Sequence, residues 1–124
     1  MRSAVFLSAV LALFASRVAA QADARWVVVA ADSTEVISID TASVIPLGDS
    51  VYRVWERSVS LGSNVPRVLA RADFDCRLRL TRTVTVTLAG FAPVPASDED
   101  REWTEIPPGS SYEAEWRKLC PAGG

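Results

Sequence analysis

Hydrophobic and polar residues alternate along much of the chain, and this pattern predicts β-strands. Residues 26–30 form an apolar run and residues 35–39 are rich in β-branched side chains, with an Asp-Ser-Thr turn between them. These two segments predict a hairpin. Residues 68–76 alternate with a period of two and predict a longer strand. Residues 51–60 predict another long strand, although neither of its faces is cleanly apolar.

The segment from residue 77 to residue 88 shows the clearest alternation in the chain. Its apolar positions run from Leu78 to Leu88, with Arg82 as the exception, and threonines and arginines occupy the positions between them. A period of two over so many residues predicts one antiparallel strand. The row of threonines predicts a face of that strand in contact with water.

The C-terminal segment has the features of a short helix. It follows the turn Pro107-Pro108-Gly109, and Ser110 and Glu113 have the spacing of a capping box. An apolar stripe then predicts which side of the helix packs on the sheet; it consists of Tyr112, Trp116 and Leu119. The whole pattern predicts an α+β fold, a single antiparallel sheet of about six strands with a C-terminal helix packed on it.

Residues 1–20 predict a secretory signal peptide rather than part of the fold. Arg2 precedes an apolar run of about a dozen residues, and small residues at positions 18–20 fit a cleavage site. The alternative is a retained membrane anchor, for which the run is short. The mature domain is then residues 21–124, with no further segment that could span a membrane. No cysteine lies directly after the apolar run, where a lipid would be attached, so we expect no lipid anchor.

The two cysteines, Cys76 and Cys120, predict one disulfide. An exported domain folds in an oxidising compartment, where two cysteines most simply pair with each other. The alternative, a reactive thiol pair, would call for Cys-x-x-Cys spacing or a nearby histidine, and the chain has neither. The bridge would tie the end of the C-terminal helix to the sheet.

Composition disfavours several functional classes. The chain has no histidine, so histidine-based catalytic triads and histidine metal sites are excluded, and its net charge of −2 disfavours nucleic acid as a partner. Residues 98–100 are acidic, which raises a calcium alternative, but the spacing fits no EF-hand and favours a solvated loop. A carboxylate pair for glycoside hydrolysis is an alternative that no pattern locates. We therefore expect no enzymatic activity, no cofactor and no metal.

One strand carries candidate contact residues. Arg53, Trp55 and Arg57 share a face of the segment 51–60. Arginine and tryptophan are enriched where proteins bind one another, so these residues predict a contact with a protein partner. The simpler interpretation is a partly covered strand whose arginine stems lie along Trp55.

The arrangement of residues across the mature chain resembles the surface-adhesin protein E family of bacterial exported proteins. The resemblance rests on Trp26, Ile39-Asp40 with Val44, Trp55, Asp75-Cys76, Trp103, Ile106-Pro-Pro-Gly-Ser110 and Cys120. It implies an antiparallel sheet with a disulfide-tied helix, and a bacterial envelope protein that in some members binds host matrix proteins. In this chain Ile37 and Ser38 replace aromatic residues that are common in the family.

Two functions follow as hypotheses. The first is an exported, non-enzymatic binding module that recognises a host matrix or envelope protein. The alternative is a soluble periplasmic protein with a structural or accessory role and no host ligand. The location is then either the periplasm or the secreted and cell-surface space. An uncovered sheet edge would also allow a homodimer.

Overall fold

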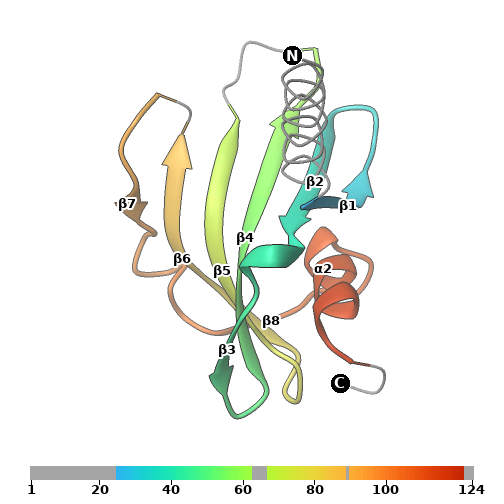
Figure 1. The fold of residues 1–124 in the computed structure, drawn as a ribbon, viewed down its shortest axis with the longest axis vertical. Helices are drawn as coiled ribbons and strands as arrows, with labels where there is room; N and C mark the ends of the chain where they lie inside the picture. The colour runs from blue at the N-terminus through green and yellow to red at the C-terminus, as the bar shows by residue number, and fades with distance from the viewer. Residues whose placement is uncertain (1–24, 63–66, 89, 122–124) are drawn as a thin grey trace, which may run out of the picture.

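The computed structural model describes residues 25–62, 67–88 and 90–121, and the predicted signal peptide lies outside these ranges. Within them the chain forms eight strands, one short 3-10 turn and one helix (Figure 1). The elements are β1 (Trp26–Ala31), β2 (Glu35–Asp40), η1 (Thr41–Ser43), β3 (Ile45–Gly48), β4 (Val51–Ser60), β5 (Val68–Asp75), β6 (Leu80–Leu88), β7 (Val94–Pro95), β8 (Thr104–Glu105) and α2 (Ser111–Leu119).

The strands form one antiparallel sheet in the order β1-β2-β4-β5-β6-β7. The short strand β3 pairs with the beginning of β4, and β8 pairs with the beginning of β6. The prediction of a single antiparallel sheet with a C-terminal helix is therefore confirmed. Within the described ranges, the structure contains no helix long and apolar enough to cross a membrane.

Strand β4 changes its neighbour partway along its length. It pairs first with β3 and then with β2. At the change, the Trp55 N–H donates to the Ser43 hydroxyl of η1 over 3.1 Å. The turn η1 is itself begun by Asp40, whose carboxylate accepts from the Ala42 N–H at 3.0 Å. Each backbone donor near the junction thus finds a partner, which β4 needs as a central strand.

The hydrophobic core lies between one face of the sheet and α2. Its buried members are Ile39, Val54, Ala72, Phe74 and Ile106, with Trp116 and Leu119 of α2 packed against them. Figure 1 shows α2 beside β1 and β2, so the helix covers one side of the sheet rather than its whole width. A helix of nine residues is marginal by itself in water. Burial of its apolar side chains is therefore what holds it in place.

The N-terminus of α2 is capped as predicted. The Ser110 hydroxyl accepts a hydrogen bond from the Glu113 N–H at 3.2 Å. The Glu113 carboxylate does not return this bond as a full capping box would. It pairs instead with Arg79, with 2.8 Å between the Arg79 Nη2 and Glu113 Oε2 atoms. The cap therefore also links the helix to the turn between β5 and β6.

The predicted disulfide between Cys76 and Cys120 is confirmed. Cys76 follows the last residue of β5, and Cys120 follows the last residue of α2. Close by, the Trp116 indole N–H donates to the Asp75 carbonyl oxygen at 3.2 Å. One covalent bond and one hydrogen bond thus join the end of the helix to the same end of the sheet.

The predicted strand from residue 77 begins later than expected. Residues 77–79 belong to the turn between β5 and β6, and β6 starts at Leu80. In that turn the Asp75 Oδ1 atom accepts from the backbone N–H groups of Arg77 at 3.0 Å and Leu78 at 2.8 Å. An aspartate that bonds its own downstream backbone favours a turn over a continued strand. The prediction was wrong at this end for that reason.

A bulge in the pairing of β5 with β6 corrects the predicted threonine face. The register shifts opposite Arg71, and Val84 is the extra residue. Because a shift of one residue turns side chains to the other face, Thr81 and Thr83 lie on the α2 side and Arg82 on the opposite side. Thr81 is only 6% exposed, so the threonine row is not uniformly solvated. The bulge also explains why Arg82 broke the alternation.

Candidate functional site

The face of the sheet opposite α2 carries a group of arginine and tryptophan side chains. Cross-strand pairing places Arg53 beside Asp73, Trp55 beside Arg71, and Asp73 beside Arg82, so these side chains share one face. The core residues of α2 contact the other face. This surface, the Arg–Trp face, comprises Trp26, Arg53, Trp55, Arg57, Arg71, Asp73, Arg82 and Trp103.

Three tryptophan rings on this face each lie under an arginine from elsewhere in the chain. The distances from the guanidinium carbon to the ring centroid are 4.5 Å for Arg57 over Trp26, 4.6 Å for Arg71 over Trp55, and 4.3 Å for Arg82 over Trp103. Each stack contributes about 0.5–1 kcal/mol where it is exposed to solvent. The stacks hold large, rotamer-rich side chains in one orientation before any partner arrives.

A buried carboxylate holds two of the arginines. Asp73 is fully buried, and Arg53 donates to both of its oxygens, over 2.7 Å and 3.1 Å. Arg82 donates to Asp73 Oδ2 at 2.9 Å. Burial opposes ionisation of this carboxyl group, but the hydrogen bonds from Arg53 and Arg82 outweigh it and lower the pKa of Asp73. Two cations share one anion here, and the group therefore has an excess of positive charge.

The structure places the three predicted contact residues in three different environments. Arg53 is held by Asp73, and Trp55 lies under Arg71 rather than under its neighbours on the same strand. Arg57 stacks on Trp26, and its buried Nε atom has no hydrogen-bond partner. The simpler interpretation, with arginine stems of the same strand along Trp55, is therefore wrong in its pairing. Cross-strand neighbours do the stacking instead.

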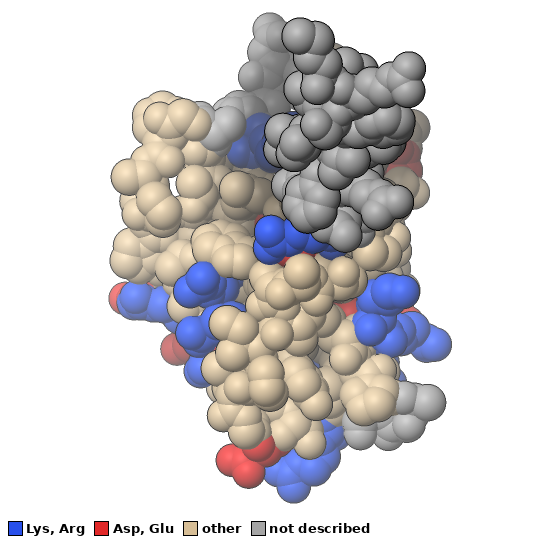
Figure 2. All heavy atoms as spheres, in the orientation of Figure 1, with Lys and Arg blue, Asp and Glu red and all other residues tan. Residues whose placement is uncertain are grey.

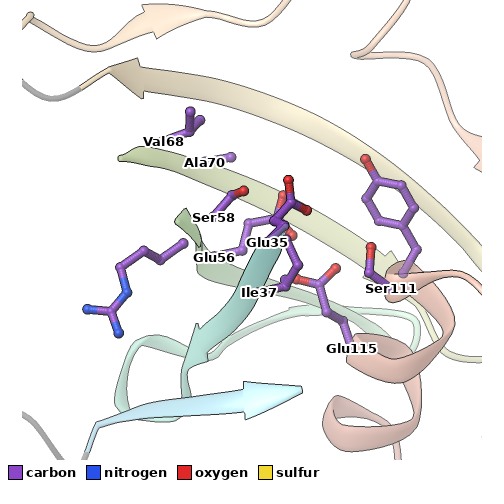
Figure 3. Close-up of a pocket in the computed structure, with 10 residues that line it drawn as sticks. Glu35, Ile37, Glu56, Ser58, Val68, Ala70, Ser111 and Glu115 are labelled. Atoms are coloured by element: carbon purple, nitrogen blue, oxygen red, sulfur yellow. The ribbon is translucent and has the colours of Figure 1, made fainter. Parts of the chain in front are cut away.

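The second polar feature is a pair of glutamates between α2 and the sheet, which sequence reasoning missed. Glu115 of α2 is only 1% exposed, and its carboxyl group lies within hydrogen-bonding reach of the carboxyl group of Glu56 on β4. No ordinary donor reaches Glu56 Oε2 or Glu115 Oε1. Figure 3 shows the Glu115 side chain reaching from the helix toward the strands that carry Glu56 and Ile37. The two acids can therefore bond only through a proton that they share.

Burial governs the electrostatics of this carboxyl pair. Loss of solvent is the largest cause, and the hydrogen bond and the charge of Glu56 add to it. Together they raise the pKa of Glu115 to about 11. Burial also raises the pKa of Glu56, while the hydrogen bond from Glu115 opposes that rise. Burial and the nearby carboxylates raise the pKa of the Tyr112 hydroxyl as well. The pair consequently keeps at least one proton, and therefore carries one negative charge at most, across the physiological pH range.

A cavity of about 180 Å³ adjoins the pair. Its lining combines three carboxyl groups with hydroxyl groups and apolar side chains, and comes from β2, β4, β5 and α2 (Figure 3). The residues are Glu35, Ile37, Glu56, Arg57, Ser58, Val68, Ala70, Ser111, Tyr112 and Glu115. The predicted apolar stripe of α2 is corrected here, since Tyr112 is 39% exposed and Glu115 occupies the buried position.

The spacing on the helix could have revealed Glu115. It lies three residues after Tyr112 and four before Leu119, which is inside the apolar stripe.

The carboxyl pair does not fit glycoside hydrolysis, because hydrogen-bonded carboxyl groups are closer than the roughly 5 Å that retaining glycosidases need. The described residues include no group of three or more side chains placed to hold a metal ion.

Basic side chains occur in several separate groups on the face of the molecule that Figure 2 shows. They form no continuous stripe on that face.

Comparisons with protein-family models, with curated proteins and with solved structures gave no match. The resemblance to the surface-adhesin protein E family therefore stays a prediction.

Proposed function

We propose that the protein is an exported, non-enzymatic binding module that recognises a protein partner through the Arg–Trp face. The observation that carries the proposal is the set of three arginine–tryptophan stacks on the side of the sheet away from α2. Tryptophan and arginine are the side chains most enriched among the residues that dominate binding energy. Host matrix proteins and envelope proteins are the candidate partners that the family resemblance suggests.

Preorganisation supports binding by this face. Ordering a flexible side chain on binding costs roughly 0.5–1.5 kcal/mol, and a side chain already stacked in the free protein avoids much of that cost. Arg53 and Arg82 keep 26% and 33% of their side-chain surface exposed while they pair with Asp73. They are thus fixed in position and still accessible to a partner.

Charge indicates the chemistry of the partner. The residues that define the Arg–Trp face include four arginines and one aspartate, although the chain as a whole has a net charge of −2. Asp75 and the Arg25–Asp40 ion pair lie on the same side of the sheet and leave it with an excess of positive charge. A positive surface on an acidic protein is complementary to an acidic surface. We therefore propose a partner whose contact region is rich in Asp and Glu, with apolar or aromatic groups to cover the tryptophan rings.

The proposal is tested with purified residues 21–124 against a panel of purified matrix proteins and a solubilised envelope fraction. Arg71→Gln removes the guanidinium over Trp55 without breaking an ion pair that the structure records, and Trp55→Ala removes the ring. We expect each to weaken partner binding at least tenfold. Arg79→Gln is the control for loss of a stack outside this face, because Arg79 stacks on Trp116 from the turn beside α2. It also removes the ion pair with Glu113, so its fold is checked in the same way.

Equal binding by wild type, Arg71→Gln and Trp55→Ala, with all three folded by circular dichroism, would rule out the Arg–Trp face. Cell fractionation with surface protease digestion tests the location separately. A protein found only in the periplasm could not contact host matrix. That result would favour the structural or accessory role inside the envelope and an envelope protein as partner.

A further inference from the structure

The cavity beside the carboxyl pair has a surplus of acidic groups, and none of the described residues supplies a cation paired with them. Glu35, Glu56 and Glu115 all line it. The one basic residue in the lining, Arg57, places its guanidinium over Trp26 on the Arg–Trp face. Neither buried carboxyl group forms a recorded ion pair, whereas Asp73 on the other face has two. The positive charge that usually accompanies a buried carboxylate is missing here.

We infer that this cavity binds a primary ammonium group on a short alkyl chain, either a free amine or the lysine side chain of a peptide. The inference rests on the buried Glu115 side chain, whose Oε1 atom accepts no hydrogen bond from a described donor, together with the cavity that this side chain lines. It does not rest on the function proposed for the Arg–Trp face, although Arg57 belongs to that face and also lines the cavity.

Size and lining favour an alkylammonium ion over a metal ion. About 180 Å³ is on the order of ten times the space that one water molecule needs. Ile37, Val68 and Ala70 supply apolar surface for a carbon chain, and the carboxyl pair supplies acceptors for the three N–H donors of an ammonium group. A calcium ion would need six to eight oxygen ligands, and the described residues offer no suitable cluster.

Binding would exchange a proton for the cation. The shared proton of the Glu56–Glu115 pair leaves to solvent, both carboxylates become charged, and the ammonium group neutralises one of them. The other charged or titratable groups nearby are Glu35 on β2, Arg57 on β4, Tyr112 on α2, and Asp100 in the connection between β7 and β8. Arg57 opposes a cation, but its guanidinium lies over Trp26. Glu35 and Asp100 add negative potential, which favours the cation. Release of one proton makes the affinity rise with pH.

The test is a titration of uniformly ¹⁵N-labelled residues 21–124 with n-butylammonium, followed through the backbone amides of Ser111, Tyr112 and Glu115. We expect saturable shifts and a Kd that falls about tenfold for each pH unit between pH 6 and pH 9, because one proton is released. Glu115→Gln should weaken binding at pH 8 by at least thirtyfold and abolish the pH dependence. Glu102→Gln, a control in an exposed position, should behave as wild type.

Several results would overturn the inference. These are equal shifts with n-butanol, a Kd that does not change with pH, undiminished binding by Glu115→Gln, or a stronger response to Ca²⁺ than to n-butylammonium. The absence of any saturable shift at pH 9 would show that the pair is purely structural. A second arm distinguishes the sources of the ammonium group. The probe is lysine amide acetylated on its α-amino group, which keeps the side-chain ammonium group free. Binding at least as tight as that of n-butylammonium indicates a peptide, and weaker binding indicates a free amine.

Discussion

The carboxyl pair predicts that the protein becomes less stable as the pH rises through neutrality. In the unfolded chain Glu115 ionises near its ordinary pKa of 4.5, whereas in the folded chain burial and Glu56 raise its pKa to about 11. A raised pKa in the folded state gives stability that is complete below pH 4.5 and is lost as the pH rises toward 11. The loss is about 1.4 kcal/mol for each pH unit in that window.

The composition of the chain allows this change of stability with pH to be assigned to the carboxyl pair. There is no histidine, and both cysteines are in the disulfide, so few other side chains titrate between pH 5.5 and pH 9. Asp73 and Asp32 have lowered pKa values, so the stability that they contribute is lost only as the pH falls below about 4. The raised pKa of Tyr112 acts above pH 10. Within the window, the carboxyl pair determines the trend.

Glu115→Gln is the informative variant. Its side-chain amide can donate the same hydrogen bond to Glu56, but it needs no proton from solvent on folding. Wild type at pH 7 is therefore less stable than at pH 4.5 by about 3 kcal/mol, and the variant avoids this loss. We expect the variant to be more stable than wild type at pH 7 and the difference to increase with pH.

The measurement is urea unfolding of the oxidised protein at half-unit steps from pH 5.5 to pH 9, with linear extrapolation to water. Between pH 6 and pH 8 the free energy of unfolding of wild type should fall by about 3 kcal/mol, and that of Glu115→Gln should stay nearly flat. Glu102→Gln should follow wild type. A wild-type stability that is flat or rises with pH, or a variant with the wild-type slope, would refute the shared-proton assignment.

Three further substitutions test the disulfide, the ion pairs of Asp73 and the cap of α2. Cys120→Ser should cost about 4 kcal/mol by the loop-entropy estimate for a separation of 44 residues, and should speed amide exchange in α2 while the strands stay protected; unchanged exchange in α2 would contradict the role of the disulfide. Asp73→Asn leaves two arginines without a carboxylate and should cost about 3 kcal/mol in urea unfolding, so a neutral effect would contradict the charge assignment. Ser110→Ala should cost about 1 kcal/mol, visible as a lower Tm, because the helix loses its cap.

Local patterns were sufficient for the frame of the fold. The strand predicted over residues 51–60 has the bounds of β4, and the cap at Ser110 predicted the start of α2. Cysteine number and compartment predicted the disulfide. These features depend on residues close in sequence or on a count. The short strand β3 was missed because Pro46 and Gly48 are typical of a turn, and here they lie at an edge that pairs with β4.

The features that carry function depend on contacts between distant segments. The bulge at Val84 decides that Arg82 joins the Arg–Trp face; the break in the alternation at Arg82 does not by itself distinguish a bulge from a polar residue on an apolar face. Trp55 meets Arg71 only because β4 and β5 pair in one register. A sequence pattern can indicate that arginine and tryptophan lie on a strand. It cannot tell which arginine lies over which ring.

The buried glutamates were still harder to predict from local sequence patterns. A charged residue at a helix position is normally assigned to solvent, since burial of an unpaired carboxylate is costly. Glu115 becomes tolerable only because Glu56 arrives from β4 and the two can share a proton. That compensation arises between two elements far apart in the chain. Glu56 itself faces α2 because it alternates with residues of the Arg–Trp face along β4.

This alternation makes the two proposals separable by experiment. Glu56 and Arg57 are adjacent on β4, yet their side chains lie on opposite faces of the sheet. Arg71→Gln should therefore weaken binding to the acidic partner and leave the pH slope of stability unchanged, while Glu115→Gln should flatten the slope and leave partner binding unchanged. If either substitution changes both properties, the two faces are coupled through β4, and a cation in the cavity would then regulate the Arg–Trp face.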